Sequence, residues 1–280
     1  MTTDRSEQDT VAYSVTNGIA WVKFNRPEKR NCMSPKLNRQ MLRVLDELEF
    51  RDDVGVLVLS GEGDSWSAGM DLKEYFRETE ADGLPGIRKA QRESYGWWER
   101  LRWYQKTTIA MVNGWCFGGG YGPLYACDLA FCADEAQFGL SEINWGILPG
   151  GGATKVAVNL MPMRKAMYHA LLGENLTGPE AAAAGLVNES MPRAQLEARV
   201  TEVANKLLKK NLETLKASKD AIRRTMEMTY DNAEDYLIRA QEALNFHDKS
   251  DGRHEGMRQF LDEKSFKPGL GEYNKTKADA

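Results

Sequence analysis

Three segments of the chain combine small residues with groups that could do acid–base or oxyanion chemistry. Residues 67–74 read Ser-Ala-Gly-Met-Asp-Leu-Lys-Glu, and residues 113–120 read Asn-Gly-Trp-Cys-Phe-Gly-Gly-Gly. Each follows an apolar run typical of a buried strand and leads into a helical pattern, so each can present free N–H groups at a helix N-terminus. Two such donors directed at one oxygen would form an oxyanion hole. Alternatively, the small residues serve only tight turns and close packing.

The third segment, residues 138–152, places Glu142 between apolar neighbours just after a predicted strand. A carboxyl group in such surroundings is partly desolvated, which raises its pKa toward values useful for proton transfer. The simpler alternative is a glutamate at a helix start that pairs with backbone N–H groups. Glu142 is therefore the candidate general acid–base.

Several other catalytic and binding motifs are not matched. The glycine-rich residues 114–122 lack the GxGxxG spacing, because Pro123 stands where the third glycine would fall, and they lack the Lys-Ser/Thr ending of a P-loop. No serine lies in a GxSxG elbow, which disfavours an α/β-hydrolase. The chain has three histidines, His169, His247 and His254. They form no HExxH pair, so no metal site is expected.

The predicted elements put these segments at the ends of strands. Alternating apolar residues at 11–15 and 19–24 around Asn17-Gly18 predict a β-hairpin. Ser34 is a predicted N-cap, followed by apolar residues at helical spacing. Further strands are predicted at 54–59, 109–112, 129–132 and 137–140.

The chain as a whole is predicted to be an α/β core with a helical C-terminal part. Gly83-Leu84-Pro85-Gly86 predicts a break before a helix rich in aromatic residues, and from about residue 154 the pattern is almost entirely helical. No linker divides the chain. A shift in composition near residue 200 separates a predicted core, 1–200, from a helical region, 201–280.

Composition excludes several classes of protein. The 280 residues carry 37 Lys and Arg against 41 Asp and Glu, a net charge of −4, and no long basic run, which disfavours nucleic-acid and anionic-membrane binding. The first ten residues have no apolar core of a signal peptide, and no stretch reaches the roughly 18 apolar residues of a membrane span. The four cysteines lack CxxC spacing. We therefore expect reduced thiols and a cytoplasmic protein.

Taken together, the three segments resemble the crotonase superfamily, the enoyl-CoA hydratase/isomerase family. Residues 25–31, Asn-Arg-Pro-Glu-Lys-Arg-Asn, and 185–188, Gly-Leu-Val-Asn, extend the likeness. The resemblance implies an α/β spiral of ββα units with a helical C-terminal trimerisation region, in trimers that often pair as hexamers. It also implies an acyl-CoA thioester whose oxygen is held by the N–H groups of Met70 and Gly119, with Glu142 catalytic and with no metal or redox cofactor.

Within that family, residues 69–76, 115–120 and 141–146 are most similar to the hydroxycinnamoyl-CoA hydratase-lyases. Such enzymes hydrate feruloyl-CoA or p-coumaroyl-CoA and then cleave the product to an aromatic aldehyde, vanillin or 4-hydroxybenzaldehyde, and acetyl-CoA. The resemblance assigns substrate contacts to Tyr75, Gly122, Trp145 and Tyr236, and CoA contacts to Lys29, Ala68 and Leu72. Tyr75 would bind the phenolic oxygen and Lys29 the CoA phosphates; an ordinary half-buried helix tyrosine and a solvated turn lysine are the alternatives.

Two positions depart from that sub-family. Gly122 stands where the hydroxycinnamoyl-CoA hydratase-lyases have a serine and where ordinary enoyl-CoA hydratases have a second glutamate. This difference predicts a single catalytic carboxylate and added volume for an aromatic ring. The alternative is that Gly122 only relieves packing before Pro123. The sub-family also has a tyrosine in its C-terminal helical region that reaches the substrate of a neighbouring subunit. In this chain Ile238 stands at that position, and Tyr236 is the closest phenol.

Two other functions are compatible with the sequence: hydration or isomerisation of aliphatic acyl-CoA, and a non-catalytic scaffold of the same fold. A scaffold needs neither Glu142 nor both oxyanion loops, so catalysis is favoured. The expected partners are a hydroxycinnamoyl-CoA thioester, acetyl-CoA and further copies of the chain, with no nucleic acid and no membrane.

Overall fold

The computed structural model describes residues 9–267, 269 and 271–275. The described residues form two compact units. One unit comprises the residues through Tyr104 together with Thr108–Thr201, and the other comprises Gln105–Thr107 together with the residues from Glu202 onward.

A six-stranded sheet forms the centre of the first unit, in the order β1-β2-β3-β5-β7-β10. The predicted hairpin is confirmed: β1 and β2 pair antiparallel around Asn17 and Gly18, which both have positive φ as such a turn requires. The pairs β2–β3, β5–β7 and β7–β10 are parallel. The strands are β1 (Val11–Thr16), β2 (Ile19–Phe24), β3 (Val56–Gly61), β5 (Thr107–Val112), β7 (Leu129–Ala133) and β10 (Glu189–Met191).

A second, four-stranded sheet has the order β4-β6-β8-β9. Its strands are β4 (Ser65–Ser67), β6 (Trp115–Phe117), β8 (Gln137–Gly139) and β9 (Leu176–Thr177). Each successive turn of chain gives one strand to the large sheet and the next to the small one, as in β3 then β4, β5 then β6, and β7 then β8. This alternation confirms the predicted spiral of ββα units.

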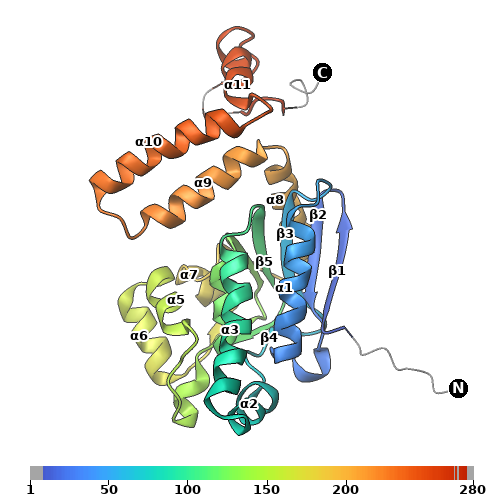
Figure 1. The fold of residues 1–280 in the computed structure, drawn as a ribbon, viewed down its shortest axis with the longest axis vertical. Coiled ribbons are helices and arrows are strands. Elements are labelled where there is room, and N and C mark those ends of the chain that lie inside the picture. Colours follow the sequence, from blue (N-terminus) through green and yellow to red (C-terminus); the bar gives the residue numbers. More distant parts are fainter. Residues whose placement is uncertain (1–8, 268, 270, 276–280) are drawn as a thin grey trace, which may run out of the picture. The chain divides into compact units, whose positions relative to one another are not determined.

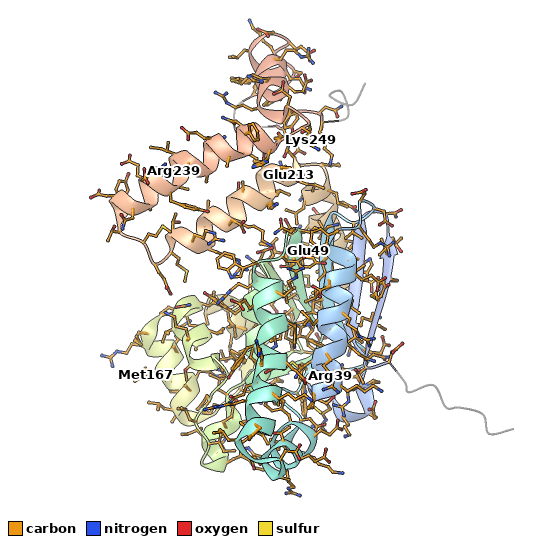
Figure 2. All side chains as sticks on the ribbon, viewed as in Figure 1. Arg39, Glu49, Met167, Glu213, Arg239 and Lys249 are labelled. Carbon is orange, nitrogen blue, oxygen red and sulfur yellow. The ribbon has the colours of Figure 1, made fainter. Side chains whose placement is uncertain are left out.

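Helices α1 (Pro35–Glu49) and α3 (Gly83–Arg102) lie side by side in the first unit (Figure 1). The predicted cap of α1 is confirmed, because the Ser34 hydroxyl accepts a hydrogen bond from the Leu37 N–H. The two helices are joined by the indole N–H of Trp97, which donates to Asn38 at 2.9 Å. Arg39 and Glu93 add an ion pair, and Arg39 projects from the lower half of α1 in Figure 2.

The break predicted at residues 83–86 is confirmed at its start, because helix α2 ends at Ala81 and Gly83 has a φ of +66°, but it does not extend to residue 86. Helix α3 already begins at Gly83 and continues through Pro85. Proline is tolerated there because the first turn of a helix has no intrahelical partner for its N–H groups. Burial of the aromatic residues further along α3 stabilises the whole helix, since Trp97 is fully buried and packs 6.1 Å from Phe24.

The remaining helices complete the two units. Those of the first are α2 (Glu78–Ala81), α4 (Tyr121–Ala126), α5 (Ala153–Leu160), α6 (Met163–Leu172) and α7 (Gly178–Ala183), and α8 (Arg193–Leu208) continues into the second. The second unit is helical, as predicted, with α9 (Leu212–Thr225), α10 (Tyr230–His247) and α11 (Gly252–Leu261). Helices α9 and α10 pack against each other (Figure 1). None of the described helices is both long and apolar enough to cross a membrane.

Asn113 holds the β3–β4 connection against the end of β5. Its side-chain amide donates to the carbonyl oxygens of Gly61 and Gly63 at 2.9 and 2.8 Å, and its oxygen accepts from the Gly61 N–H at 3.2 Å. The side chain is buried, so no bulk water replaces these bonds if it is removed. Asn113 therefore fixes the backbone that leads into β4.

We expect Asn113→Ala to lower the free energy of unfolding by about 2–4 kcal/mol, because each buried polar group left unpaired costs about 1–3 kcal/mol. Urea unfolding at neutral pH measures this loss. Asn159→Ala is the matched control: it removes a single hydrogen bond, to Tyr125, at a partly exposed site, and should cost less than about 1 kcal/mol. Equal losses in the two variants would contradict a special role for Asn113.

Candidate active site

The three segments singled out in the sequence follow three neighbouring parallel strands. Strands β4, β6 and β8 pair in that order, and residues 68–71, 118–120 and 141–145 come directly after them. Carboxyl ends of parallel strands meet at one edge of a sheet, where ligands of α/β proteins usually bind. The small sheet therefore brings the loops of Met70, Gly119 and Glu142 together.

The loops of Met70 and Gly119 touch through their backbones. A Cβ atom at Gly69, where φ is +87°, would lie 2.6 Å from the Phe117 carbonyl oxygen and 3.2 Å from the Gly119 nitrogen. A Cβ atom at Gly119 would lie 3.4 Å from the Met70 nitrogen and 2.8 Å from the Met70 sulfur. Glycine is needed at residue 69 both for its backbone angle and for this close approach.

The N–H groups of Met70 and Gly119 are available as donors. Backbone bonds on either side of Met70 use its neighbours: Gly69 accepts from the Met33 N–H at 2.7 Å, and the Asp71 N–H donates to Met33 at 3.0 Å. Gly119 lies in the first turn of the short helix Gly118–Gly120, where N–H groups have no intrahelical acceptor. Across residues 9–267, no hydrogen bond starts from either N–H group. Two such donors can hold one developing oxyanion.

Glu142 points its carboxylate at the oxyanion loop. It lies in the short helix Ser141–Trp145 that follows β8, and a Cβ atom at Gly118 would lie 2.5 Å from its Oε1 atom. Its Oε2 atom is buried and has no hydrogen-bond partner among the residues that the structure describes. Burial raises the pKa of the Glu142 carboxyl above the ordinary glutamate value. A buried carboxyl group with an unused oxygen beside two oxyanion donors is suited to proton transfer.

The helix that carries Glu142 rests on the end of α6. The Asn144 side chain donates to the Gly173 carbonyl at 3.4 Å, and a Cβ atom at Gly173 would lie 2.7 Å from Ile143. Within the turn, the Ile147 N–H donates to the Glu142 carbonyl at 3.0 Å. These contacts fix the backbone of Glu142, so its carboxylate is held without a side-chain partner of its own.

A buried hydrogen-bond chain joins the oxyanion loop to α6. The hydroxyl of Tyr121, the first residue of α4, lies 2.8 Å from Nε2 of His169, and Nδ1 of His169 lies 2.9 Å from the Glu174 carbonyl oxygen. A carbonyl can only accept, so Nδ1 carries the proton and Nε2 accepts from Tyr121. Burial lowers the pKa of His169, which keeps the imidazole neutral.

An ion cluster fixes Met70 from its other side. Asp71 accepts from the N–H groups of Lys73 and Glu74 at 3.0 and 2.9 Å, and so caps the helical segment η2 (Leu72–Arg77). Its other oxygen lies 3.2 Å from the buried Arg26 guanidinium. Burial acts to raise the pKa of Asp71, but the Glu74 N–H, the Cys32 thiol and nearby positive charge outweigh it and hold the pKa at about 2.

Lys29, the predicted phosphate contact, belongs to the same cluster. Its ammonium lies 2.6 Å from the Glu74 carboxylate and 3.5 Å from Asp71, and its side chain is 43% exposed. These carboxylates raise the pKa of Lys29, first because Glu74 accepts a hydrogen bond from its ammonium. The other two predicted CoA contacts flank Met70 on its loop: Ala68 is half-buried and Leu72 is 61% exposed.

The volume predicted at Gly122 is not there. A Cβ atom at Gly122 would lie 2.7–2.9 Å from three atoms of the Trp98 indole, so the ring already covers this position. The prediction failed because nothing in the sequence shows that α3 places Trp98 across α4. The open space lies beside the pair instead, as a pocket of about 430 Å³. Its lining includes Tyr95, Trp98, Gly122, Tyr125 and Gly151.

Tyr75 lies on η2, one turn beyond Met70, and its hydroxyl is 3.0 Å from Ser94 on α3. Trp145, another predicted substrate contact, is 70% exposed on the Glu142 helix. Tyr236 and Ile238 lie on α10 of the second unit, where Tyr236 is half-buried and Ile238 is 56% exposed. The first unit by itself thus brings together Met70, Gly119 and Glu142, and does not include Tyr236.

Sequence reasoning missed Asp71, Arg26 and Trp98 as supports of the site. Asp71 had a detectable signal, since an aspartate just before a helical segment is a common N-cap. Arg26 and Trp98 act across long sequence separations, which a single sequence does not show. Over the described part of the chain, no three His, Cys, Asp or Glu side chains are grouped so that they could hold a metal ion.

Comparisons with known proteins agree with this geometry. Residues 14–268 match the family model described as enoyl-CoA hydratase/isomerase. The chain is 51% identical over 276 residues to hydroxycinnamoyl-CoA hydratase-lyase from Pseudomonas fluorescens, covering 98% of this chain and 100% of that protein. It is 34% identical over 192 residues to 4-chlorobenzoyl coenzyme A dehalogenase-2 from an Arthrobacter species, covering 69% and 70%. Among solved structures, enoyl-CoA hydratase from Bacillus anthracis has a TM-score of 0.82 at 26% identity, covering 91% of this chain and 96% of that one.

We expect Gly122→Ser to lower the free energy of unfolding by about 1–3 kcal/mol, the usual cost of overpacking a buried contact. Chemical denaturation measures it. Gly96→Ser is the control, because a Cβ atom at Gly96, in the middle of α3, meets no other atom within 4 Å. In a Trp98→Leu background the same Gly122 substitution should cost less. A loss that is unchanged in that background would show that the indole is not the obstacle.

We expect Asp71→Asn to reduce the loss of stability on acidification. The folded pKa of about 2 lies below the unfolded value of about 3.9, so the carboxylate stabilises the fold above pH 4 and this contribution is lost as the pH falls toward 2. Urea midpoints at pH 5 and pH 3 should therefore differ less in the variant than in the wild type. Asp52→Asn, on an exposed turn, is the control and should keep the wild-type difference. An unchanged difference in Asp71→Asn would contradict the assignment.

Proposed function

Because the chain belongs to the enoyl-CoA hydratase/isomerase family, we propose that it is an acyl-CoA lyase that hydrates a hydroxycinnamoyl-CoA and cleaves the product to an aromatic aldehyde and acetyl-CoA. The observation that carries this proposal is the 51% identity, over 98% of the chain, to a hydroxycinnamoyl-CoA hydratase-lyase. The convergence of Met70, Gly119 and Glu142 supports it, because this reaction needs an oxyanion hole and a proton carrier.

The first half of the reaction is addition of water. The thioester carbonyl oxygen accepts hydrogen bonds from the N–H groups of Met70 and Gly119. Glu142 takes a proton from water as the oxygen adds to the β-carbon, and the charge that develops on the thioester oxygen is stabilised by the two donors. Return of the proton to the α-carbon gives the β-hydroxyacyl-CoA. The unpartnered Oε2 atom of Glu142 can make these transfers without first breaking another bond.

The second half is a retro-aldol cleavage in the same site. Glu142 takes the proton of the β-hydroxyl group, the bond between the α- and β-carbons breaks, and the β-carbon leaves as the aldehyde. The electron pair passes to the acetyl-CoA enolate, whose oxygen lies again at the Met70 and Gly119 donors. Protonation of its α-carbon completes acetyl-CoA. One oxyanion hole and one carboxylate therefore serve both steps.

Aromatic substrates such as feruloyl-CoA and p-coumaroyl-CoA fit the groups around this centre. The proposed ring contacts are Tyr75, whose phenol binds the para oxygen, together with Gly122, Trp145 and Tyr236. An electron-rich para oxygen stabilises positive character at the β-carbon. Support for the contact at Gly122 comes from the pocket that it lines together with the aromatic side chains of Tyr95, Trp98 and Tyr125, on which a planar ring can pack.

The CoA part is proposed to lie along the Met70 loop. Ala68 and Leu72 are within two residues of the oxyanion donor, and the exposed side chain of Lys29 offers a positive charge near the same loop. To bind a phosphate, the Lys29 ammonium would give up part of its ion pair with Glu74.

We propose a homotrimer in the cytoplasm; whether two trimers pair as a hexamer is left open. Support for association comes from α6, which exposes a row of apolar side chains; Met167 projects outward from it in Figure 2. The exposed members are Met163, Met167, Tyr168, Leu171 and Leu172. Such a contiguous apolar surface is typical of a protein interface.

The decisive test is incubation of the purified protein with feruloyl-CoA. We expect vanillin and acetyl-CoA in equal amounts, followed by absorbance and chromatography. Crotonyl-CoA is the comparison substrate and should be hydrated much more slowly. If crotonyl-CoA is hydrated far faster than feruloyl-CoA is cleaved, the protein is an aliphatic enoyl-CoA hydratase instead.

We expect Glu142→Gln to lower kcat for hydration and cleavage by about 10²–10⁴, the usual contribution of a positioned acid–base, while CoA thioesters still bind. In the wild type, burial raises the pKa of Glu142, and the carboxylate is the active base for water addition. The kcat/KM profile should therefore lose activity on acidification at a pH above the ordinary glutamate pKa. Turnover of the variant within about threefold of wild type would exclude Glu142 as the base.

A further inference from the structure

Among the described residues, the Tyr75 hydroxyl has one hydrogen-bond partner, the Ser94 hydroxyl. The two oxygens lie 3.0 Å apart; Tyr75 is 8% exposed and Ser94 is fully buried in α3. Burial raises the pKa of the Tyr75 phenol, so it is protonated at neutral pH. The direction of this hydrogen bond decides what Tyr75 can offer to a ligand.

That direction follows from the other bond of Ser94. Its hydroxyl donates to the Gln91 carbonyl at 3.0 Å, and a carbonyl can only accept. A serine hydroxyl has one proton, so towards Tyr75 the Ser94 oxygen must be the acceptor. Tyr75 therefore donates its hydroxyl proton to Ser94, and only the lone pairs of the Tyr75 oxygen remain to accept a hydrogen bond from a further partner.

Ser94 also lies close to the rest of the site. It is one helical turn before Trp98 on α3, so the two side chains share a face. Trp98 covers Gly122, which lies three residues after Gly119. The same face of α3 thus orients Tyr75 and closes the site over α4.

We infer that Ser94 is a specificity-determining residue that makes Tyr75 a hydrogen-bond acceptor, so that the site selects rings with a free phenol over rings with an ether at the same position. The inference rests on the proposed function, in which Tyr75 meets the para oxygen of the ring. A free phenol extends the chain from substrate to Tyr75, Ser94 and the Gln91 carbonyl. Donation of the phenol proton into this chain leaves its oxygen more electron-rich, which favours reaction at the β-carbon.

The first experiment compares kcat/KM for p-coumaroyl-CoA and 4-methoxycinnamoyl-CoA. The wild type should prefer the free phenol by about tenfold or more, because the ether cannot donate and leaves the Tyr75 oxygen unpaired. Ser94→Ala frees the Tyr75 proton to donate to the ether, and the preference should fall to within about threefold. Ser60→Ala is the matched control: it removes one buried serine hydroxyl in β3, which lies 3.1 Å from the Met111 carbonyl and 3.3 Å from Oδ1 of Asn113, and should keep the wild-type preference.

A double-variant cycle tests whether Ser94 acts through Tyr75. In a Tyr75→Phe background, Ser94→Ala should change the substrate preference by less than about twofold, since no phenol remains to orient. Additive effects would show that Ser94 acts on packing alone and would overturn the inference.

A pH titration of bound p-coumaroyl-CoA tests the same hydrogen bond without a methoxy substrate, so the size of that group plays no part. In Glu142→Gln, bound p-coumaroyl-CoA persists, and ionisation of its phenol shifts its absorption to longer wavelength. An acceptor at Tyr75 favours the neutral phenol, whereas a donor favours the phenolate. The phenol pKa should therefore be about one unit or more lower in Glu142→Gln/Ser94→Ala than in Glu142→Gln. Equal values would overturn the inference even if methoxy substrates are excluded by size.

The outcomes separate this inference from the proposed function. If the wild type forms no aldehyde from p-coumaroyl-CoA, the function itself fails, and the inference with it. If aldehyde forms while Ser94→Ala matches the wild type in both preference and titration, the function stands and the inference alone is wrong.

Discussion

The active site depends on one constraint, the parallel pairing of three very short strands. Strands β4, β6 and β8 are each only three residues long, yet their order decides where every reactive group lies. Paired strands lie roughly 4.8 Å apart, so loops that leave their carboxyl ends start within reach of one another. Met70, Gly119 and Glu142 each follow a strand end by no more than three residues. The spacing between donors and base is thus set mainly by the backbone.

The frame around these loops stabilises them from two sides. On one side, Asp71 caps its helical segment and pairs with the buried Arg26. On the other side, the hydroxyl of Tyr121 and the imidazole of His169 connect α4 to the residues that support Glu142. Both arrangements satisfy their own polar groups, and within the described residues they leave the Met70 and Gly119 N–H groups and one oxygen of Glu142 without partners, as the proposed reaction requires. This is the pattern expected of a preorganised site, in which the polar groups of the frame have little need to rearrange during the reaction.

Local patterns in the sequence were sufficient to predict the hairpin at Asn17-Gly18, the Ser34 cap and the two backbone loops. They failed where a distant contact decides the outcome. Gly83 and Pro85 are ordinary helix breakers, but they lie in the first turn of α3, where proline is tolerated, and the helix that follows is long and buries its aromatic side chains. Strands β4 and β6 are too short to show a period. The space at Gly122 could not be judged without knowing that Trp98 covers it.

The hydrogen bonds of His169 have a consequence for how protons are distributed around the site. Burial opposes the charged form of His169 by lowering its pKa, so the imidazole stays neutral and its Nε2 atom accepts the hydrogen bond from the Tyr121 hydroxyl. Burial likewise raises the pKa of Tyr121 and of the Cys116 thiol, which keeps both neutral. The buried groups behind the oxyanion loop therefore hold a constant number of protons around neutral pH. In the proposed mechanism the moving protons are those of Glu142, water and the substrate, so solvent isotope effects on turnover would report on those three participants.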